Sequence, residues 1–154
     1  MIASALAKCM QGRCVLVGVG NRLCGDDGFG PCVIERLRGE VEIPLIEAGI
    51  APENYIGVVA QHQPREIVIF DALSLAGEVG SLHWIESGEL ESAGMSTHGP
   101  SLDMFVTYIE QSLGAQMHIL GVVPGRTDLG EPMTAAVAQA VDRVVASVLE
   151  VARA

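Results

Sequence analysis

Apolar residues occur along this chain in two kinds of run, short continuous ones and longer ones with helical spacing. The clearest continuous run is REIVIFD at residues 65–71, which is typical of a central parallel strand buried on both faces. Helical spacing is clearest over residues 100–113 and 134–152, where apolar residues recur every three or four positions. The chain therefore alternates between strand and helix patterns.

The other elements follow the same two patterns. We predict strands over residues 13–20, 41–47, 65–71, 80–85 and 116–123, and helices over 27–37, 53–61, 100–113 and 134–152. The strand at 80–85 is short and alternating, which favours a sheet edge. This order implies an α/β fold, with a twisted, mostly parallel five-stranded sheet, helices on both faces and one antiparallel edge strand.

Composition narrows the class of protein. The 154 residues suit a single α/β domain, 1–154, in which residues 1–12 form an irregular or helical N-terminal extension without an assigned role. The net charge of −10 argues against nucleic acid and anionic membranes as partners. The sequence has neither a signal-peptide core nor a transmembrane run, and its four cysteines form no CxxC pair. We therefore expect reduced thiols and a cytoplasmic location.

A glycine-rich loop with two acids, GVGNRLCGDDGFG, follows the first predicted strand at residues 18–30. The dinucleotide-binding fingerprint requires a third glycine where this chain has Leu23. Asp26 and Asp27 also stand where a pyrophosphate would meet the start of a helix. We predict that Asp26 caps the helix, which lets Asp27 point elsewhere. The loop is better suited to a cation than to an anion.

Three polar residues stand where we expect the carboxyl ends of the parallel strands to lie. Asp27 follows the first strand, Asp71 ends the third, and His98 precedes the helix at 100–113. Two carboxylates and an imidazole can hold a divalent transition metal and leave positions open for water or substrate. Without a cation, two close carboxylates repel and one takes up a proton.

Each of the three residues also has a purely structural interpretation. Asp27 can stabilise the positive end of a helix, Asp71 can accept hydrogen bonds from loop N–H groups, and His98 can open a helix. Spacing alone leaves both interpretations open. The sequence contains no HExxH, GxSxG or P-loop motif that would favour a different chemistry.

Five segments of the chain resemble those of the hydrogenase maturation endopeptidases. They are residues 18–30 (GVGNRLCGDDGFG), 48–54 (AGIAPEN), 67–72 (IVIFDA), 96–100 (STHGP) and 120–124 (LGVVP). The resemblance extends from Cys14 to Val148, and the second segment is similar to the formate-hydrogenlyase branch. Members of this family remove the C-terminal extension from the precursor of the [NiFe]-hydrogenase large subunit.

The resemblance implies roles for particular residues. Asp27, Asp71 and His98 correspond by motif to the family's metal ligands and catalytic residues, while Gly20, Asn21 and Gly25 shape the loop that meets the substrate. Nickel is expected to arrive inside the precursor, and zinc or cadmium can replace it in crystals. The metal would polarise the scissile carbonyl or activate an attacking water. We expect the chain to act as a monomer.

Two other functions remain open at this point. A non-catalytic nickel-binding maturation chaperone would use the same three residues to check or deliver the metal. A nucleotide-binding α/β domain would instead be stabilised by NAD or ATP, although the glycine loop departs from that fingerprint.

Overall fold

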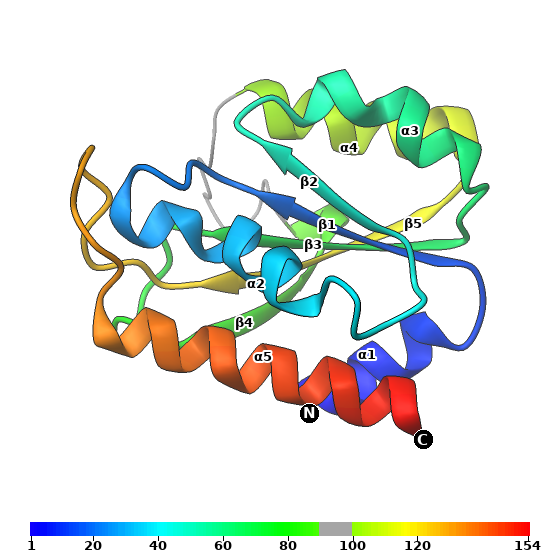
Figure 1. Cartoon of the computed structure of the whole chain (residues 1–154). Coiled ribbons are helices and arrows are strands. Elements are labelled where there is room, and N and C mark those ends of the chain that lie inside the picture. The colour runs from blue at the N-terminus through cyan, green and yellow to red at the C-terminus, as the bar shows by residue number, and fades with distance from the viewer. Residues whose placement is uncertain (90–99) are drawn as a thin grey trace.

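The chain forms one five-stranded sheet with the strand order β2-β1-β3-β5-β4 (Figure 1). The computed structural model describes residues 1–89 and 100–154. The strands are β1 (Cys14–Val19), β2 (Leu45–Gly49), β3 (Glu66–Ala72), β4 (Leu82–Glu86) and β5 (Gln116–Val122). All neighbouring pairs are parallel except β4 and β5, which are antiparallel. The predicted α/β sheet with one antiparallel edge strand is confirmed.

Helices cover both faces of this sheet (Figure 1). One face packs against α1 (Ile2–Met10), α2 (Phe29–Leu37) and α5 (Ala135–Arg153), and the other against α3 (Ile56–Gln61) and α4 (Pro100–Leu113). Short 3₁₀ turns are η1 (Gly25–Gly28), η2 (Pro52–Tyr55) and η3 (Ser87–Glu89). Because both faces are covered, the central strand β3 is apolar on both sides.

The element boundaries depart from the sequence prediction in places where local chemistry interrupts the pattern. α4 has the predicted bounds, and the N-terminal extension is the helix α1. By contrast, β2 begins at Leu45 rather than at residue 41. Pro44, which lacks an N–H, stands directly before it and contributes only its carbonyl, to the N–H of Leu16 (3.1 Å).

Glycines allow α2 to pack directly on the sheet backbone. A Cβ added to Gly30 would lie 2.2 Å from the carbonyl oxygen of Phe70 and 2.5 Å from that of Val19. A Cβ on Gly18 would in turn lie 2.5 Å from the carbonyl oxygen of Gly30. This contact fixes the start of α2 over β1 and β3, and with it the loop that joins β1 to α2.

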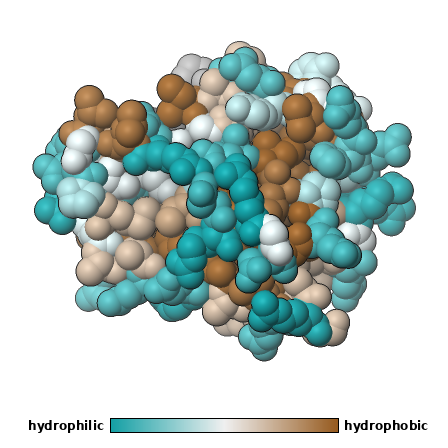
Figure 2. Space-filling model, viewed as in Figure 1, coloured by the Kyte–Doolittle hydropathy of each residue, from teal (hydrophilic) through white to brown (hydrophobic). Residues whose placement is uncertain are grey.

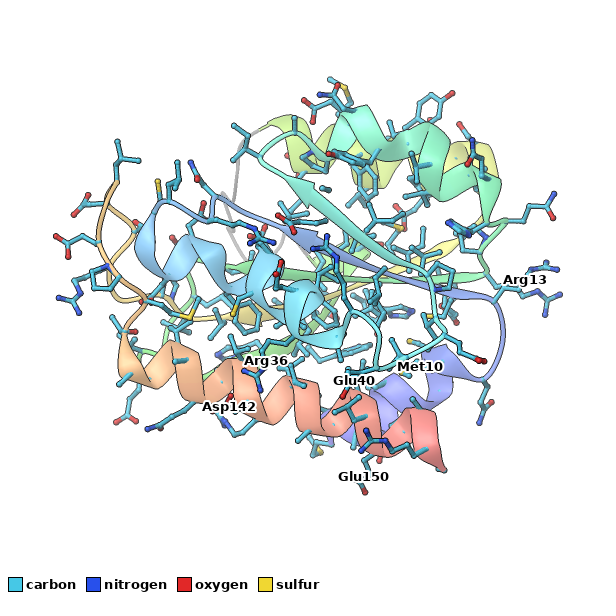
Figure 3. The ribbon with its side chains drawn as sticks, viewed as in Figure 1. Met10, Arg13, Arg36, Glu40, Asp142 and Glu150 are labelled. Atoms are coloured by element: carbon cyan, nitrogen blue, oxygen red, sulfur yellow. The ribbon has the colours of Figure 1, made fainter. Side chains whose placement is uncertain are left out.

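The last helix, α5, is amphipathic. Its buried face consists of small and β-branched residues, namely Val137, Ala140, Val141, Val144, Val145 and Val148. On its outer side, Arg36 of α2 and Asp142 point toward one another and form an exposed ion pair of 2.8 Å (Figure 3). Within residues 1–89 and 100–154, none of the helices combines the length and apolarity needed to cross a bilayer.

We expect Gly30→Ala to lower the free energy of unfolding by about 1–3 kcal/mol, because its methyl group would force α2 away from the sheet. Gly57→Ala in α3 is the matched control. Nothing lies within 4 Å of its added Cβ, so it should leave stability unchanged or raise it by about 0.4–1 kcal/mol. Urea denaturation measures both, and equal stabilities would contradict the close packing.

Candidate active site

The strand order places a topological switch point at the carboxyl ends of β1 and β3. From β1 the chain passes to β2 on one side and then returns to β3 on the other. In parallel sheets, ligands bind outside the carboxyl ends of the strands at such a switch point. Asp27 lies in η1, which follows β1 and contacts β3, and Asp71 is the penultimate residue of β3. Both carboxylates therefore belong to this edge.

Asp71 is completely buried at the end of the central strand. One of its carboxylate oxygens, Oδ1, accepts a hydrogen bond of 2.8 Å from the N–H of Ala72. Its neighbours Phe70 and Ala72 pack into the core beneath α2 and α5. By strand alternation, Asp71 faces the side covered by α3 and α4.

The third predicted residue, His98, lies outside the described residues. It stands two positions before Pro100, where α4 begins. In Figure 1 this end of α4 lies on the same side of the molecule as the arrowheads of the parallel strands. That His98 meets the two aspartates remains a prediction.

The glycine loop folds back on itself and orients Asp27. Gly20 has a φ of 139°, and a Cβ there would lie 1.9 Å from the carbonyl oxygen of Asp27. The backbone N–H of Asn21 donates to Oδ2 of the half-buried Asp27 at 2.8 Å. The side-chain oxygen of Asn21 accepts from the N–H of Leu23 at 2.9 Å and closes a turn.

Asp26 has a different role from the predicted one, because it does not cap α2. It is completely buried, and its carboxylate accepts the N–H groups of Gly125, Arg126 and Thr134 at 2.7, 3.1 and 2.7 Å. The Thr134 hydroxyl adds a bond of 2.9 Å and itself caps α5 by accepting the N–H of Val137. Donors from a distant loop thus satisfy this carboxylate better than the start of its own helix could.

The same contact explains the glycine before Asp26. Gly25 has a φ of 55°, and a Cβ there would lie 2.4 Å from the carbonyl oxygen of Arg126. That carbonyl accepts the N–H of Asp26 at 2.7 Å. The glycine loop and the loop before α5 are therefore joined through their backbones as well as through a side chain.

Arg22 braces the outer side of the glycine loop. Its Nε donates to Glu47 at the end of β2 at 2.6 Å, and its guanidinium also contacts Glu35 of α2. Hydrogen bonds from Arg22 lower the pKa of Glu47 and of Glu35, and these carboxylates raise the pKa of Arg22. Arg38 joins the same network through both glutamates.

Apolar side chains surround the loops at this end of the molecule. Leu23, Ile50 and Leu129 are 66%, 63% and 75% exposed. The N–H of Gly130 donates to the carbonyl of Leu23, and the N–H of Gly20 to that of Gly49, so the three loops are neighbours. Figure 2 shows apolar side chains on this left-hand end of the molecule. These side chains leave apolar surface beside the glycine loop.

Comparison with known proteins identifies the family. A family model described as "Hydrogenase maturation protease" matches residues 32–151. The Hydrogenase 3 maturation protease of Escherichia coli is 30% identical over 133 residues, which cover 84% of this chain and 85% of the relative. The chain belongs to the hydrogenase maturation proteases.

Solved structures of maturation proteases share the fold. The [NiFe] hydrogenase maturation protease HycI from Thermococcus kodakarensis superposes with a TM-score of 0.88 at 30% identity, over 97% of this chain and 99% of that one. The endopeptidase HycI from Escherichia coli gives a TM-score of 0.76 at 26% identity, with 88% of each chain covered.

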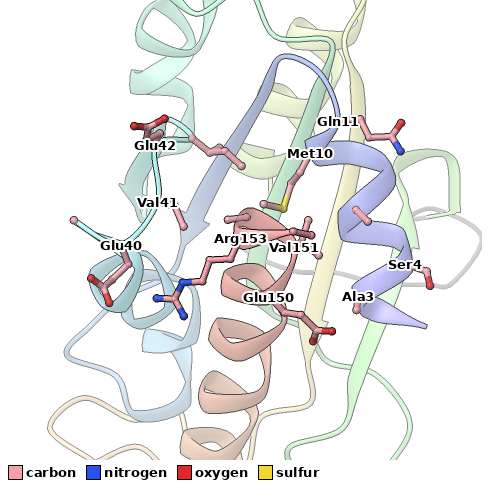
Figure 4. Close-up of a pocket in the computed structure, with 15 residues that line it drawn as sticks. Ala3, Ser4, Met10, Gln11, Glu40, Val41, Glu42, Glu150, Val151 and Arg153 are labelled. Atoms are coloured by element: carbon pink, nitrogen blue, oxygen red, sulfur yellow. The ribbon is translucent and has the colours of Figure 1, made fainter.

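A groove of about 890 Å³ in this maturation protease lies away from the strand-end carboxylates. It runs between α1, the last turn of α5 and residues 39–43 (Figure 4). Its charged lining consists of Glu40, Glu42, Glu150 and Arg153. Neither Asp27 nor Asp71 lines it, so this groove is separate from the candidate active site beside the glycine loop.

We expect Asp26→Asn to lower the free energy of unfolding by about 2–3 kcal/mol, because an amide cannot accept all the hydrogen bonds of a buried carboxylate. Asp27→Asn is the matched control, since its amide oxygen can still accept the N–H of Asn21. It should cost less than about 1 kcal/mol. Chemical denaturation compares the two, and equal losses would assign Asp27 a structural role.

We expect Arg22→Gln to lower stability by about 0.2–1 kcal/mol at neutral pH. Because Arg22 lowers the pKa of folded Glu47, the stabilisation is present above the unfolded value of about 4.3 and is lost as the pH falls through the folded value. Thermal unfolding between pH 7 and pH 3 should show the difference disappearing in acid. Arg13→Gln, whose side chain points outward at the other end (Figure 3), should show no such trend.

Proposed function

We propose that this chain is the endopeptidase that removes the C-terminal extension of a nickel-loaded [NiFe]-hydrogenase large-subunit precursor. Membership of the maturation protease family supports the reaction class. The observation that carries the finer assignment is the arrival of Asp27 and Asp71 at one switch point of the sheet from two separate elements. His98 is the third member of the proposed site.

The chemistry of these donors fits a cation carried by the substrate. A completely buried carboxylate such as Asp71 requires compensation by hydrogen bonds or positive charge. Carboxylate oxygens and an imidazole nitrogen are suitable ligands for a divalent transition metal. Nickel in the precursor would thus complete its coordination at this edge, and only a precursor that had received its metal would be held in position.

The surrounding surface suits a folded protein substrate. Leu23, Ile50 and Leu129 offer apolar area around the acidic edge, and Gly20 lets the loop close tightly on the carbonyl of Asp27, which holds the acidic edge in place. The precursor would contact this rim while its nickel lies between the carboxylates. In this proposal, contact with the rim and with the nickel together would position one peptide bond of the precursor for cleavage.

Peptide hydrolysis at such a site requires no serine or cysteine nucleophile. Nickel held by these residues would act as a Lewis acid, which would polarise the scissile carbonyl or lower the pKa of an attacking water. In this proposal Asp27 and Asp71 orient the metal and the peptide bond, and either carboxylate can accept the proton released by water. Asn21 keeps Asp27 in place through its backbone N–H.

We expect Asp27→Asn to reduce cleavage of the nickel-loaded precursor by at least about a hundredfold without unfolding the chain, since it removes a group that orients the metal. The assay incubates purified protein with loaded and nickel-free precursor and measures shortening by mass spectrometry. Only the loaded form should be cut. Asp142→Asn, on the outer face of α5, is the matched control and should cut normally.

Two results would contradict the proposal. Tight nickel binding by the wild-type chain with no cleavage of either precursor indicates a maturation chaperone instead. Equal cleavage by Asp27→Asn and wild type removes Asp27 from the site. Anomalous scattering from crystals soaked in cadmium tests the ligand set independently, because density should lie at Asp27, Asp71 and His98.

A further inference from the structure

A second group of potential metal ligands lies near the amino ends of the parallel strands, opposite the candidate active site. Cys9 comes from α1, Glu66 is the first residue of β3, and His118 is near the start of β5. One ligand atom from each residue lies within 4.8 Å of the other two. This thiol, carboxylate and imidazole come from three separate elements, and their convergence is a tertiary feature of the fold.

Two of the three residues are buried, Glu66 is partly exposed, and the imidazole is held in a defined orientation. Cys9 is 3% exposed and His118 is 7% exposed. His118 Nε2 lies 2.7 Å from Glu66 Oε2, and Nδ1 lies 2.5 Å from Glu86 Oε2. The indole N–H of Trp84 donates to the other oxygen of Glu86 at 3.0 Å. Glu86 thus orients the ring from the nitrogen that does not contact Glu66.

We propose that Cys9, Glu66 and His118 form a binding site for a divalent transition metal of the zinc class. Thiolate sulfur, imidazole nitrogen and carboxylate oxygen are the usual ligands of zinc. Glu86 then completes the arrangement in which a metal-binding histidine donates its second N–H to a carboxylate. Water takes the fourth position.

The local charges favour a cation, because the carboxylates of Glu66 and Glu86 both lie within hydrogen-bond distance of the His118 ring beside Cys9. Metal binding breaks the S–H bond of Cys9, forms the metal–sulfur bond and releases the proton to solvent. Of the two positive charges of the ion, one replaces that proton and the other neutralises the carboxylate of Glu66, while Glu86 stays anionic as the acceptor of the second N–H of His118.

The site is accessible to solvent through its carboxylates. The side chains of Glu66 and Glu86 are 24% and 51% exposed. Glu66 and Asp71 are five positions apart on β3, which is roughly 16 Å along a strand, and they face opposite sides of the sheet. The two sites are therefore separate.

The consequence is a metal link between α1 and the sheet. Cys9 lies in the last turn of α1, while the other two ligands lie on adjacent strands. Any ion that binds only the folded arrangement raises stability in proportion to its concentration and affinity. The site would thus hold the N-terminal helix in its docked position.

The test uses cobalt(II) as a spectroscopic probe on the full-length chain after removal of metals with a chelator. We expect one equivalent to give a thiolate-to-cobalt charge-transfer band in the near ultraviolet, and zinc to abolish it by competition. Cys9→Ser should eliminate the band, and Glu86→Ala should weaken binding about 10–100-fold. Circular dichroism confirms that each variant is folded, and Glu66→Gln replaces Cys9→Ser if that variant does not fold.

The controls separate this site from other binding. Asp27→Asn and Cys24→Ser should both retain the band, because these residues lie in the glycine loop at the carboxyl ends of the strands. Cys24→Ser also tests whether a thiol outside the proposed site gives the band. A band lost in Cys24→Ser, or the absence of any band in the wild-type chain, overturns the proposal. In that case His118 is simply a buried ring that lies between the carboxylates of Glu66 and Glu86.

Discussion

The position of the candidate active site depends on one buried carboxylate, that of Asp26. It collects hydrogen bonds from Gly125, Arg126 and Thr134, which stand about a hundred residues away in the chain. Because a buried charge is stable only when it is fully hydrogen-bonded, the loop after β1 and the loop before α5 must fold together. This contact determines the position of the next residue, Asp27. The two adjacent aspartates therefore differ in role: Asp26 supports the structure, and Asp27 is proposed to act on the substrate.

Much of the fold could be predicted from the sequence because periodicity directly reflects burial. The continuous run of β3 and the spacing of α4 required no tertiary information, whereas β2 was misplaced because apolar residues before Pro44 imitate a strand. The structural partners of Asp26 could not be predicted, since its donors are backbone groups whose position depends on tertiary folding. The same limit applies to Cys9, Glu66 and His118. Strand alternation puts the last two on one face, but only the register of β3 with β5 makes them neighbours.

The two ends of the parallel strands have opposite characters. At the carboxyl ends, Asp27 and Asp71 lie beside glycine turns and exposed apolar residues, an arrangement suited to a partner that comes and goes. At the amino ends, Cys9 and His118 are covered by α1 and surrounded by side chains that orient them. In our proposals, the sheet therefore contacts the nickel of the substrate transiently at the carboxyl ends of its strands. At the amino ends it binds a resident metal ion. The length of β3 between Glu66 and Asp71, roughly 16 Å, keeps the two sites apart.

The packing of α1 beside α5 has a practical consequence for engineering. Ala3 and Ser4 near one terminus line the same groove as Arg153 and Ala154 at the other (Figure 4). A short linker could therefore join the two termini, and new ends could be opened in an exposed turn such as the one at Gly39. Such a circular permutant would keep the residues of both proposed sites. It would also show whether the first helix must be synthesised before the sheet that it covers.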